Sequence, residues 1–264
     1  MRIGSMTITS LVDGEMSGPL GYFYPDDDVS ELTGLDRMFD PVSGNAIISI
    51  GSYLIQGGGR VVLVDAGAGP RPKSPPVAGG ALRSALLAAG VDPGEITDVV
   101  FTHLHFDHIG WATHEGAPFF ANATYHCDRR DWDHFMSPAY DVPDWEQRAT
   151  HPETDAAAVR LAPVADRMSF WEGDAEVLPG ISAIDAAGHT PGTCALVIES
   201  AGERGLLLGD IVHTQPELLY AWRFRTHDDP VRAVKQIVAI RSLLADEDIP
   251  CSGSHFPGLS WGKV

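Results

Sequence analysis

The sequence predicts an α/β fold in a single domain, and three observations support this prediction. Short apolar runs alternate with amphipathic segments along most of the chain, which is typical of strands that alternate with helices. The chain has 264 residues, 44% of them hydrophobic and 20% charged, close to the averages of globular proteins with a sizeable core. Domains of this type often hold about 200 to 250 residues. We therefore expect residues 1–264 to form one domain, built from two similar halves.

The first half is predicted to contain a hairpin, a helix and a further strand. Residues 45–56 and 60–65 are β-rich apolar runs separated by three glycines, a pattern that favours two adjacent strands joined by a flexible turn. Four prolines predict a loop over residues 67–78. A helix is expected over residues 81–89, and a buried strand over residues 98–102.

The second half repeats this alternation. Three strands are predicted, near residues 181–185, 193–199 and 205–209. A helix is expected to begin near Pro230 and to end before Pro250, because Asp229 can cap it and proline fits its first position. Its apolar face is predicted to consist of five residues, Val234, Ile237, Val238, Ile240 and Leu244.

Two segments lie outside this alternation. Residues 1–44 are rich in glycine, aspartate and aromatic residues, and we expect them to form an N-terminal arm that packs over a pocket or over a partner subunit. Such an apolar arm favours a homodimer. Residues 134–166 mix prolines, aromatics and charges and are predicted to be an insertion over the core, with a short helix in the alanine-rich residues 155–164.

Composition excludes several classes of function. With 36 acidic and 18 basic side chains the net charge is −18, so a nucleic-acid backbone would be repelled. The longest apolar runs are far shorter than the roughly 20 residues that cross a bilayer, and the N-terminus lacks the continuous apolar segment of a signal peptide. We therefore expect no membrane partner and a cytoplasmic location.

The chain has three well-separated cysteines, which argue against disulfides and against a thiolate metal site: Cys127, Cys194 and Cys251.

Potential metal ligands gather in one short segment. Residues 102–108 read Thr-His-Leu-His-Phe-Asp-His and directly follow a predicted buried strand. A tight turn at this place can point alternate side chains into one cleft, and imidazole and carboxylate groups suit zinc and other divalent ions of the first transition row. The segment therefore predicts metal ligation by four residues: His103, His105, Asp107 and His108.

Three further candidate ligands lie where other strands are predicted to end. His189 belongs to Gly-His-Thr-Pro-Gly, Asp210 follows Leu-Gly, and His255 lies in Gly-Ser-His-Phe-Pro-Gly. Each would be a weak signal alone, because such turns are common. Together with the first segment they give seven candidates, enough for two metal ions.

The order of these motifs resembles the metallo-β-lactamase superfamily from roughly residue 45 to the end of the chain. The resemblance implies a four-layer αββα sandwich with the metal site at the sheet edges. It also implies two ligand sets joined by a bridging aspartate: His103, His105 and His189 for one ion, Asp107, His108 and His255 for the other, and Asp210 between them. Asp65 would then accept a hydrogen bond that orients a ligand. Zinc is the first choice of metal, with iron, manganese or cobalt as alternatives.

A dinuclear site implies hydrolysis, since two metal ions lower the pKa of a bridging water and polarise the substrate oxygen. The resemblance thus implies a hydrolase whose metal-bridging hydroxide attacks the substrate, with Asp210 and Asp107 as catalytic residues. The alternative from another class is a scaffold that binds the metal ions without catalysis.

Individual positions separate the branches of the superfamily. Asp210 stands where the antibiotic-degrading zinc enzymes carry a cysteine, and His105 stands where oxygen-reducing diiron relatives carry a glutamate. No basic cluster near the C-terminus matches the glutathione site of glyoxalase II thioesterases. What remains resembles the lactonase and methyl parathion hydrolase branch. This implies a lactone or carboxylic ester as substrate, with an organophosphate triester or a thioester as alternatives.

His213 departs from the pattern of that branch. Homoserine-lactone lactonases have a tyrosine three residues after the bridging aspartate, whereas this chain has His213 there. The imidazole can replace the phenol as a catalytic hydrogen-bond donor to the substrate carbonyl, or it can satisfy a loop carbonyl instead.

A pocket for a small apolar ester-like substrate is expected between the N-terminal arm, the insertion and the segment after Asp210. About two or three of five aromatic residues should touch substrate: Tyr22, Phe23, Trp111, Tyr220 and Trp222. Arg223 and Arg225 can hold an acidic group or pair with local carboxylates. The remaining histidines are expected to be surface or capping residues: His114, His126, His134, His151 and His227.

Overall fold

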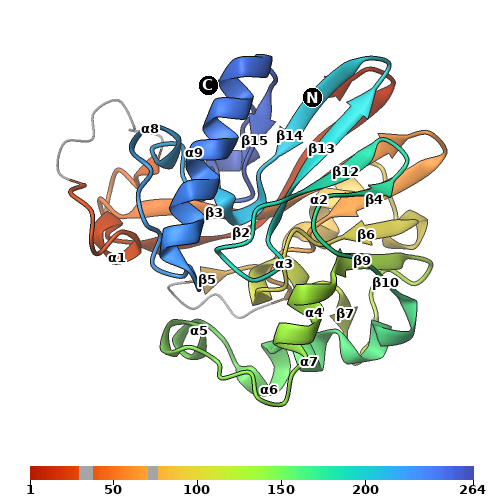
Figure 1. The fold of residues 1–264 in the computed structure, drawn as a ribbon. Coiled ribbons are helices and arrows are strands. Elements are labelled where there is room, and N and C mark those ends of the chain that lie inside the picture. Colours follow the sequence, from red (N-terminus) through yellow and green to blue (C-terminus); the bar gives the residue numbers. More distant parts are fainter. Residues whose placement is uncertain (30–37, 71–76) are drawn as a thin grey trace.

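The computed structural model describes residues 1–29, 38–70 and 77–264. Its larger sheet has the strand order β1-β2-β3-β4-β6-β9-β10, with β5 paired to β2 (Figure 1). These strands are β1 (Arg2–Ile3), β2 (Met6–Gly18), β3 (Ala46–Gly57), β4 (Arg60–Val64), β5 (Val77–Ala78), β6 (Asp98–Val100), β9 (Thr124–Asp128) and β10 (Met168–Trp171). The adjacent strands β4, β6, β9 and β10 run parallel to one another, whereas β4 is antiparallel to β3.

The second sheet has the order β11-β12-β13-β14-β15 and comes from the later part of the chain. Its strands are β11 (Ala175–Leu178), β12 (Ile181–Asp185), β13 (Cys194–Ser200), β14 (Glu203–Leu207) and β15 (Cys251–Ser252). Because β13 is antiparallel to both of its neighbours and β15 is parallel to β14, the strands β12, β14 and β15 run in the same direction. A separate pair consists of β7 (Thr113–His114) and β8 (Ala117–Pro118).

Helices cover the outer faces of both sheets. The α-helices are α1 (Leu20–Phe23), α2 (Leu82–Ala88), α3 (Phe106–Ile109), α4 (Arg129–Phe135), α5 (Asp144–Ala149), α6 (Pro152–Asp155), α7 (Ala157–Arg160), α8 (Glu217–Tyr220) and α9 (Pro230–Glu247). The 3₁₀-helices are η2 (Pro93–Glu95), η3 (Ala162–Arg167), η4 (Gly209–Ile211) and η5 (Pro257–Leu259). None of the helices in the described part of the chain is both long and apolar enough to span a membrane.

Alternate side chains of the central strands enter different layers of the core. In β3, Leu54 packs with residues of α2 and α4, whereas Tyr53 and Ile55 pack with the second sheet. In β14, Leu206 packs against α9 and Leu207 against the first sheet. The two sheets therefore lie face to face, and α9 lies on the opposite side from α4 and α7 (Figure 1). This is the four-layer αββα sandwich that the resemblance implied.

The predicted hairpin is confirmed, with ends shifted by one residue. β3 and β4 are antiparallel, and Gly57 pairs with Arg60. The turn residues Gly58 and Gly59 have φ angles of 59° and 77°, in the left-handed region that glycine adopts without steric cost. The glycine run therefore fixes where this hairpin reverses.

The predicted last helix is also confirmed, but one residue of its apolar face is wrong. The Asp229 side chain accepts a hydrogen bond from the Arg232 backbone N–H, as expected of a cap. The buried face of α9 contains Ala233, Ile237, Ile240 and Leu244, whereas Val238 is 39% exposed. The spacing of four, three and four residues keeps the buried set on one side of the helix, and position 238 falls outside it.

The prediction that residues 1–44 form an arm is wrong for their first part. β2 pairs with β3 along eleven residue positions, so Met6–Gly18 belongs to the larger sheet. Ile8 packs toward the second sheet, whereas Leu11 packs into the core on the other face of the larger sheet. The strand is therefore partly buried on both of its faces. After β2 the chain does pack onto a later segment, because Phe23 and Tyr24 form a buried cluster with Trp222 and Phe224. Residues 30–37 lie outside the described residues.

The two irregular segments of the prediction contain more structure than expected. In the predicted loop 67–78, Val77 and Ala78 form β5, and residues 71–76 lie outside the described residues. The predicted helix 155–164 is divided into α6, α7 and η3. One reason is Pro163, which has no N–H to donate to the carbonyl of Val159 and so cannot continue α7.

Candidate metal centre

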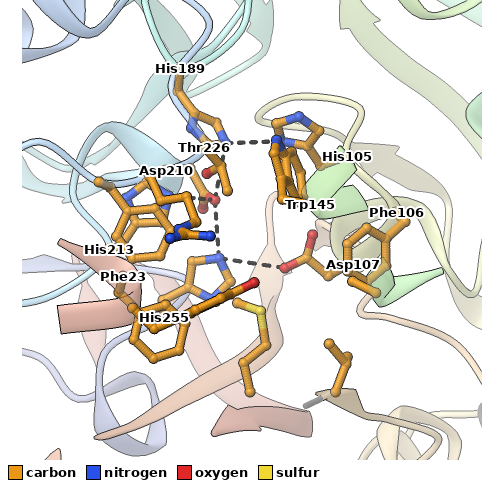
Figure 2. Close-up of a pocket in the computed structure, with 16 residues that line it drawn as sticks. Phe23, His105, Phe106, Asp107, Trp145, His189, Asp210, His213, Thr226 and His255 are labelled. Atoms are coloured by element: carbon orange, nitrogen blue, oxygen red, sulfur yellow. Dashed lines mark hydrogen bonds and ion pairs between the residues drawn. The ribbon is translucent and has the colours of Figure 1, made fainter. Parts of the chain in front are cut away.

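The seven candidate ligands and Asp65 follow the carboxyl ends of strands from both sheets. Asp65 follows β4, residues 103–108 follow β6, and these two strands are parallel neighbours. In the second sheet His189, Asp210 and His255 follow β12, β14 and β15, which run in one direction. Each sheet therefore delivers its ligands at one edge, and the two edges meet at the site (Figure 2).

The first group of nitrogen atoms belongs to three buried histidines. His105 Nδ1 lies 3.0 Å from His103 Nε2 and 2.9 Å from His189 Nε2. Burial lowers the pKa of all three imidazoles, that of His105 to about 3. Neutral rings present lone pairs, so the three nitrogens form a converging set of donors for a cation.

The second group contains Asp107, His108 and His255. Asp107 Oδ2 lies 3.8 Å from His108 Nε2 and 3.6 Å from His255 Nε2. All three side chains are buried. This group and the histidine triplet match the two ligand sets that the resemblance implied, and each could hold a metal ion.

Asp210 lies between the two groups. Its Oδ1 is 3.3 Å from His108 Nε2. Its Oδ2 is 3.0 Å from His255 Nε2 and 3.4 Å from His189 Nε2 (Figure 2). Burial raises the pKa of this carboxyl, but the surrounding imidazoles, His255 and His108 first, hold it well below its usual range. Asp210 therefore carries a negative charge at the centre of the site.

Unpartnered atoms show that this donor set fits metal ions. Within the described part of the chain, the buried atoms His108 Nε2 and Asp210 Oδ1 have no hydrogen-bond partner, although buried polar groups normally have one. Zinc ligands at about 2.0–2.1 Å in a tetrahedron are about 3.3 Å from one another, and the donor atoms described above are 2.9–3.8 Å apart. The nitrogen and oxygen donors without cysteine suit two divalent ions, zinc first.

Asp65 holds the metal-site loop as expected. His108 Nδ1 donates to Asp65 Oδ2 at 2.9 Å, and the backbone N–H of Thr102 donates to Oδ1 at 2.8 Å. On the other side of the site, His255 Nδ1 donates to the Ser49 carbonyl at 2.7 Å. Because the Nδ1 atoms of both histidines are used in this way, their Nε2 atoms face the site.

Two supporting residues were missed by the sequence analysis. Asp131 accepts hydrogen bonds from the Leu104 N–H, the Thr190 hydroxyl and the Gly192 N–H, so it connects the loop of His103 and His105 with the loop of His189. The expectation that His227 is a surface or capping residue is wrong, because it is buried and its Nδ1 lies 3.2 Å from His189 Nδ1. Both contacts join residues far apart in the chain, and no local pattern signals them.

His213 points into the site and contacts carboxylates. Its Nε2 lies 3.2 Å from Asp210 Oδ2, its Nδ1 lies 3.7 Å from Glu217 Oε2, and its ring stacks on Phe224 at 3.6 Å. Burial lowers the pKa of His213, but Asp210 and Glu217 raise it more, to about 9. No loop carbonyl accepts from this ring among the described residues, so the geometry favours a role at the site.

A pocket opens above the metal centre. The space between its walls, including the open mouth, is about 580 Å³. Tyr22 and Phe23 line it, as expected. Further lining residues are Trp145 and Ala149 from the predicted insertion, Phe224 to Thr226 from the segment after Asp210, and Met16 from β2. Trp145 was missed by the sequence analysis; its ring packs edge-on against His105 at 5.1 Å.

Three of the five predicted pocket aromatics lie elsewhere. Trp111 is buried in the core under the first sheet, and its Nε1–H donates to Asp13. Trp222 is buried against Tyr24, and Tyr220 stacks on the Trp222 ring while remaining 57% exposed. The sequence predicted aromatic character for these segments but not the direction of each side chain.

With this geometry in place, comparison with known proteins identifies the class. A family model described as the metallo-beta-lactamase superfamily matches residues 49–247. This is most of the chain, and the chain belongs to that superfamily.

Curated relatives include N-acyl homoserine lactonases. The N-acyl homoserine lactonase AiiA of Bacillus thuringiensis subsp. kurstaki is 28% identical over 123 residues, which are 47% of this chain and 41% of the lactonase. The match therefore spans less than half of that relative.

Solved structures share the fold over nearly the whole chain. AidC, a dizinc quorum-quenching lactonase solved with a product, is 21% identical with a TM-score of 0.85, covering 100% of this chain and 92% of AidC. The hydrolase AbOPH of the beta lactamase superfamily is 23% identical, also with a TM-score of 0.85, covering 100% and 95%.

Proposed function

We propose that this protein is a metal-dependent hydrolase that cleaves a lactone or a carboxylic ester. The observation that carries the proposal is the buried set of seven nitrogen and oxygen donors, centred on Asp210, at the floor of an apolar pocket. A matching relative that is named as a lactonase supports the choice of substrate class. His103, His105 and His189 would hold one divalent ion, and Asp107, His108 and His255 the other, with Asp210 shared.

Two divalent ions at this place supply charge stabilisation and lower the pKa of a bound water. The chain's own residues then position the reacting groups. As the negatively charged group at the centre of the site, Asp210 can accept a hydrogen bond from the attacking water and hold it in position. Phe23, Phe106 and Trp145 exclude bulk water from the pocket and favour an apolar substrate.

His213 is proposed to donate to the substrate carbonyl. The carboxylates of Asp210 and Glu217 favour the protonated form of its ring. Stacking of the His213 ring on Phe224 fixes the plane of the imidazole. A donor placed in this way stabilises the negative charge that develops on the carbonyl oxygen. This assigns to His213 the task for which the resembling lactonases use a tyrosine.

Replacing His213 with phenylalanine should test that assignment. The ring stack on Phe224 is kept while the N–H donor is lost, so we expect kcat for the best ester to fall about 10²-fold or more, with bound metal unchanged. His213→Gln, which keeps an N–H donor, should retain more activity than His213→Phe. Equal kcat values for wild type and His213→Phe would contradict the assignment.

A substrate panel tests the proposed function itself. Zinc-loaded protein would be assayed on γ- and δ-lactones, aryl esters, a phosphotriester, a glutathione thioester and a β-lactam, with and without a chelator. We expect lactone or ester turnover that the chelator abolishes and added zinc restores. Turnover of the phosphotriester alone would favour the second candidate, an organophosphate hydrolase that uses the same residues. No turnover of any compound by protein with two bound ions would favour a non-catalytic scaffold.

A further inference from the structure

The wall of the pocket is a continuous series of stacked side chains that leads away from the metal centre. It starts at His213, which stacks on Phe224 at 3.6 Å. Phe224 then stacks on Phe23 at 5.7 Å, and Phe23 contacts Tyr22 edge-on at 5.4 Å. The floor residue His213 is 1% exposed and Tyr22 is 38% exposed, so this series runs from the buried floor of the pocket to its mouth.

A single cationic side chain lies at the end of this series. The guanidinium of Arg225 stacks on the ring of Tyr22, with its central carbon 4.1 Å from the ring centroid. Arg225 lines the pocket, and no other arginine or lysine of the described chain does so. The Arg225 backbone N–H donates to the Phe23 carbonyl at 2.8 Å, which joins the two segments that carry this pair.

The chemistry of the pair leaves Arg225 available for an anion. Stacking occupies one face of the guanidinium, while its N–H donors lie in the plane and point outward. Within residues 1–29, 38–70 and 77–264 no carboxylate forms an ion pair with Arg225, although the chain has 36 acidic side chains. Two carboxylates line the pocket, Asp107 and Asp210, and both are at the metal centre.

We propose that Arg225, held on Tyr22, is a specificity-determining residue that binds a carboxylate at the far end of the substrate's acyl chain. The proposal rests on the proposed function and narrows its substrate class. The preferred substrate has three parts: a scissile lactone or ester over the metal centre, an apolar spacer along Phe224 and Phe23, and an acidic group at the mouth.

Matched esters test this proposal. Monophenyl esters of linear dicarboxylic acids, from adipate to sebacate, would be compared with phenyl esters of the same chain length that end in a methyl group. For Arg225→Gln we expect KM for the best carboxylate ester to rise about tenfold, since a charge-assisted hydrogen bond is lost, with kcat almost unchanged. KM for the methyl-terminated ester should change less than about twofold. Arg225→Lys should fall between wild type and Arg225→Gln, because it keeps the charge but not the planar donors.

Two controls make the result specific. Arg223→Gln removes an exposed arginine two residues away that does not line the pocket, and both esters should behave as with wild type. The rise in KM should also shrink at high salt, because Arg225 is exposed.

The outcomes separate this proposal from the proposed function. Loss of the carboxylate preference in Arg225→Gln alone supports the role of Arg225. Equal changes for both esters, or no change for either, would overturn it while leaving hydrolysis intact. If the zinc-loaded wild type cleaves neither ester nor any lactone, the proposed function fails first.

Discussion

Replacing Asp210 with asparagine is expected to lower kcat/KM for the best ester or lactone by about 10²–10³-fold, the loss seen when a charge-stabilising group is removed from a catalytic site. The substitution keeps the shape of the side chain but removes the charge at the centre of the ligand set. Both Asp210 oxygens contact imidazoles of the two groups, so binding of at least one metal ion should weaken as well. Steady-state kinetics together with metal analysis would measure both effects.

A control separates this effect from a general loss of an acidic residue. Asp133 is exposed and forms only a surface ion pair with Arg129, which contributes little to stability. Asp133→Asn should therefore keep full activity and two bound ions. If Asp210→Asn keeps wild-type activity with two bound ions, the central role of Asp210 is wrong.

Replacing Asp131 with asparagine should weaken both the fold and the metal site. Asp131 Oδ1 accepts from the Gly192 N–H and Oδ2 accepts from Leu104 and Thr190; an amide offers one oxygen and turns its NH₂ toward a donor. One buried unsatisfied donor costs about 1–3 kcal/mol of unfolding free energy. Because Leu104 and Thr190 adjoin metal ligands, metal affinity should fall about 10- to 100-fold. Denaturant unfolding and competition with a chelating dye measure these two quantities.

The same residue gives a dependence of stability on pH. Burial raises the pKa of Asp131 from its ordinary 3.8 to about 7 in the folded protein. The folded state then binds this proton more tightly than the unfolded chain, so its contribution to the unfolding free energy is present near pH 4 and is lost as pH rises to about 7. In metal-free protein the stability of wild type minus that of Asp131→Asn should decline over this window. A constant difference would contradict this assignment, and Asp133→Asn on the same helix is the matched control.

The metal motifs could be predicted because their information is local. Residues 103–108 lie within one turn that follows a buried strand, and His189, Asp210 and His255 each follow the carboxyl end of a strand. Strand ends that share a sheet edge meet in space whatever the length of chain between them. The resemblance to the superfamily implied which ligands share an ion, and this geometry is the physical reason that they come together.

The supporting residues could not be predicted because their contacts depend on packing. Asp131 lies in the first turn of α4, and its partners lie 27 to 61 residues away in the chain. The same holds for His227, whose contact with His189 depends on how the segment before α9 folds back. The direction of an aromatic side chain is equally hard to predict from the sequence. Trp145 lines the pocket, whereas Trp111 is buried in the core.

The error in the first segment has a different cause. Composition favoured an arm for residues 1–44, and no regular two-residue period marks Met6–Gly18 as a strand. Its register shifts between Val12 and Gly14, and its buried apolar residues lie on both faces of the sheet. The pairing partner β3 is buried along most of its length and shows no alternation of its own. This strand is therefore recognised from its pairing with β3 in the structure, not from a local pattern in the sequence.

The most direct test of the account is a zinc titration of metal-free protein, with hydrolysis of the best ester or lactone recorded at each step. We expect no turnover without zinc, turnover that rises as zinc is added, and saturation at two ions per chain, with Asp210→Asn at least about 100-fold less active at every step. Full turnover by the metal-free protein, or binding of two ions without turnover of any compound in the panel, would contradict it.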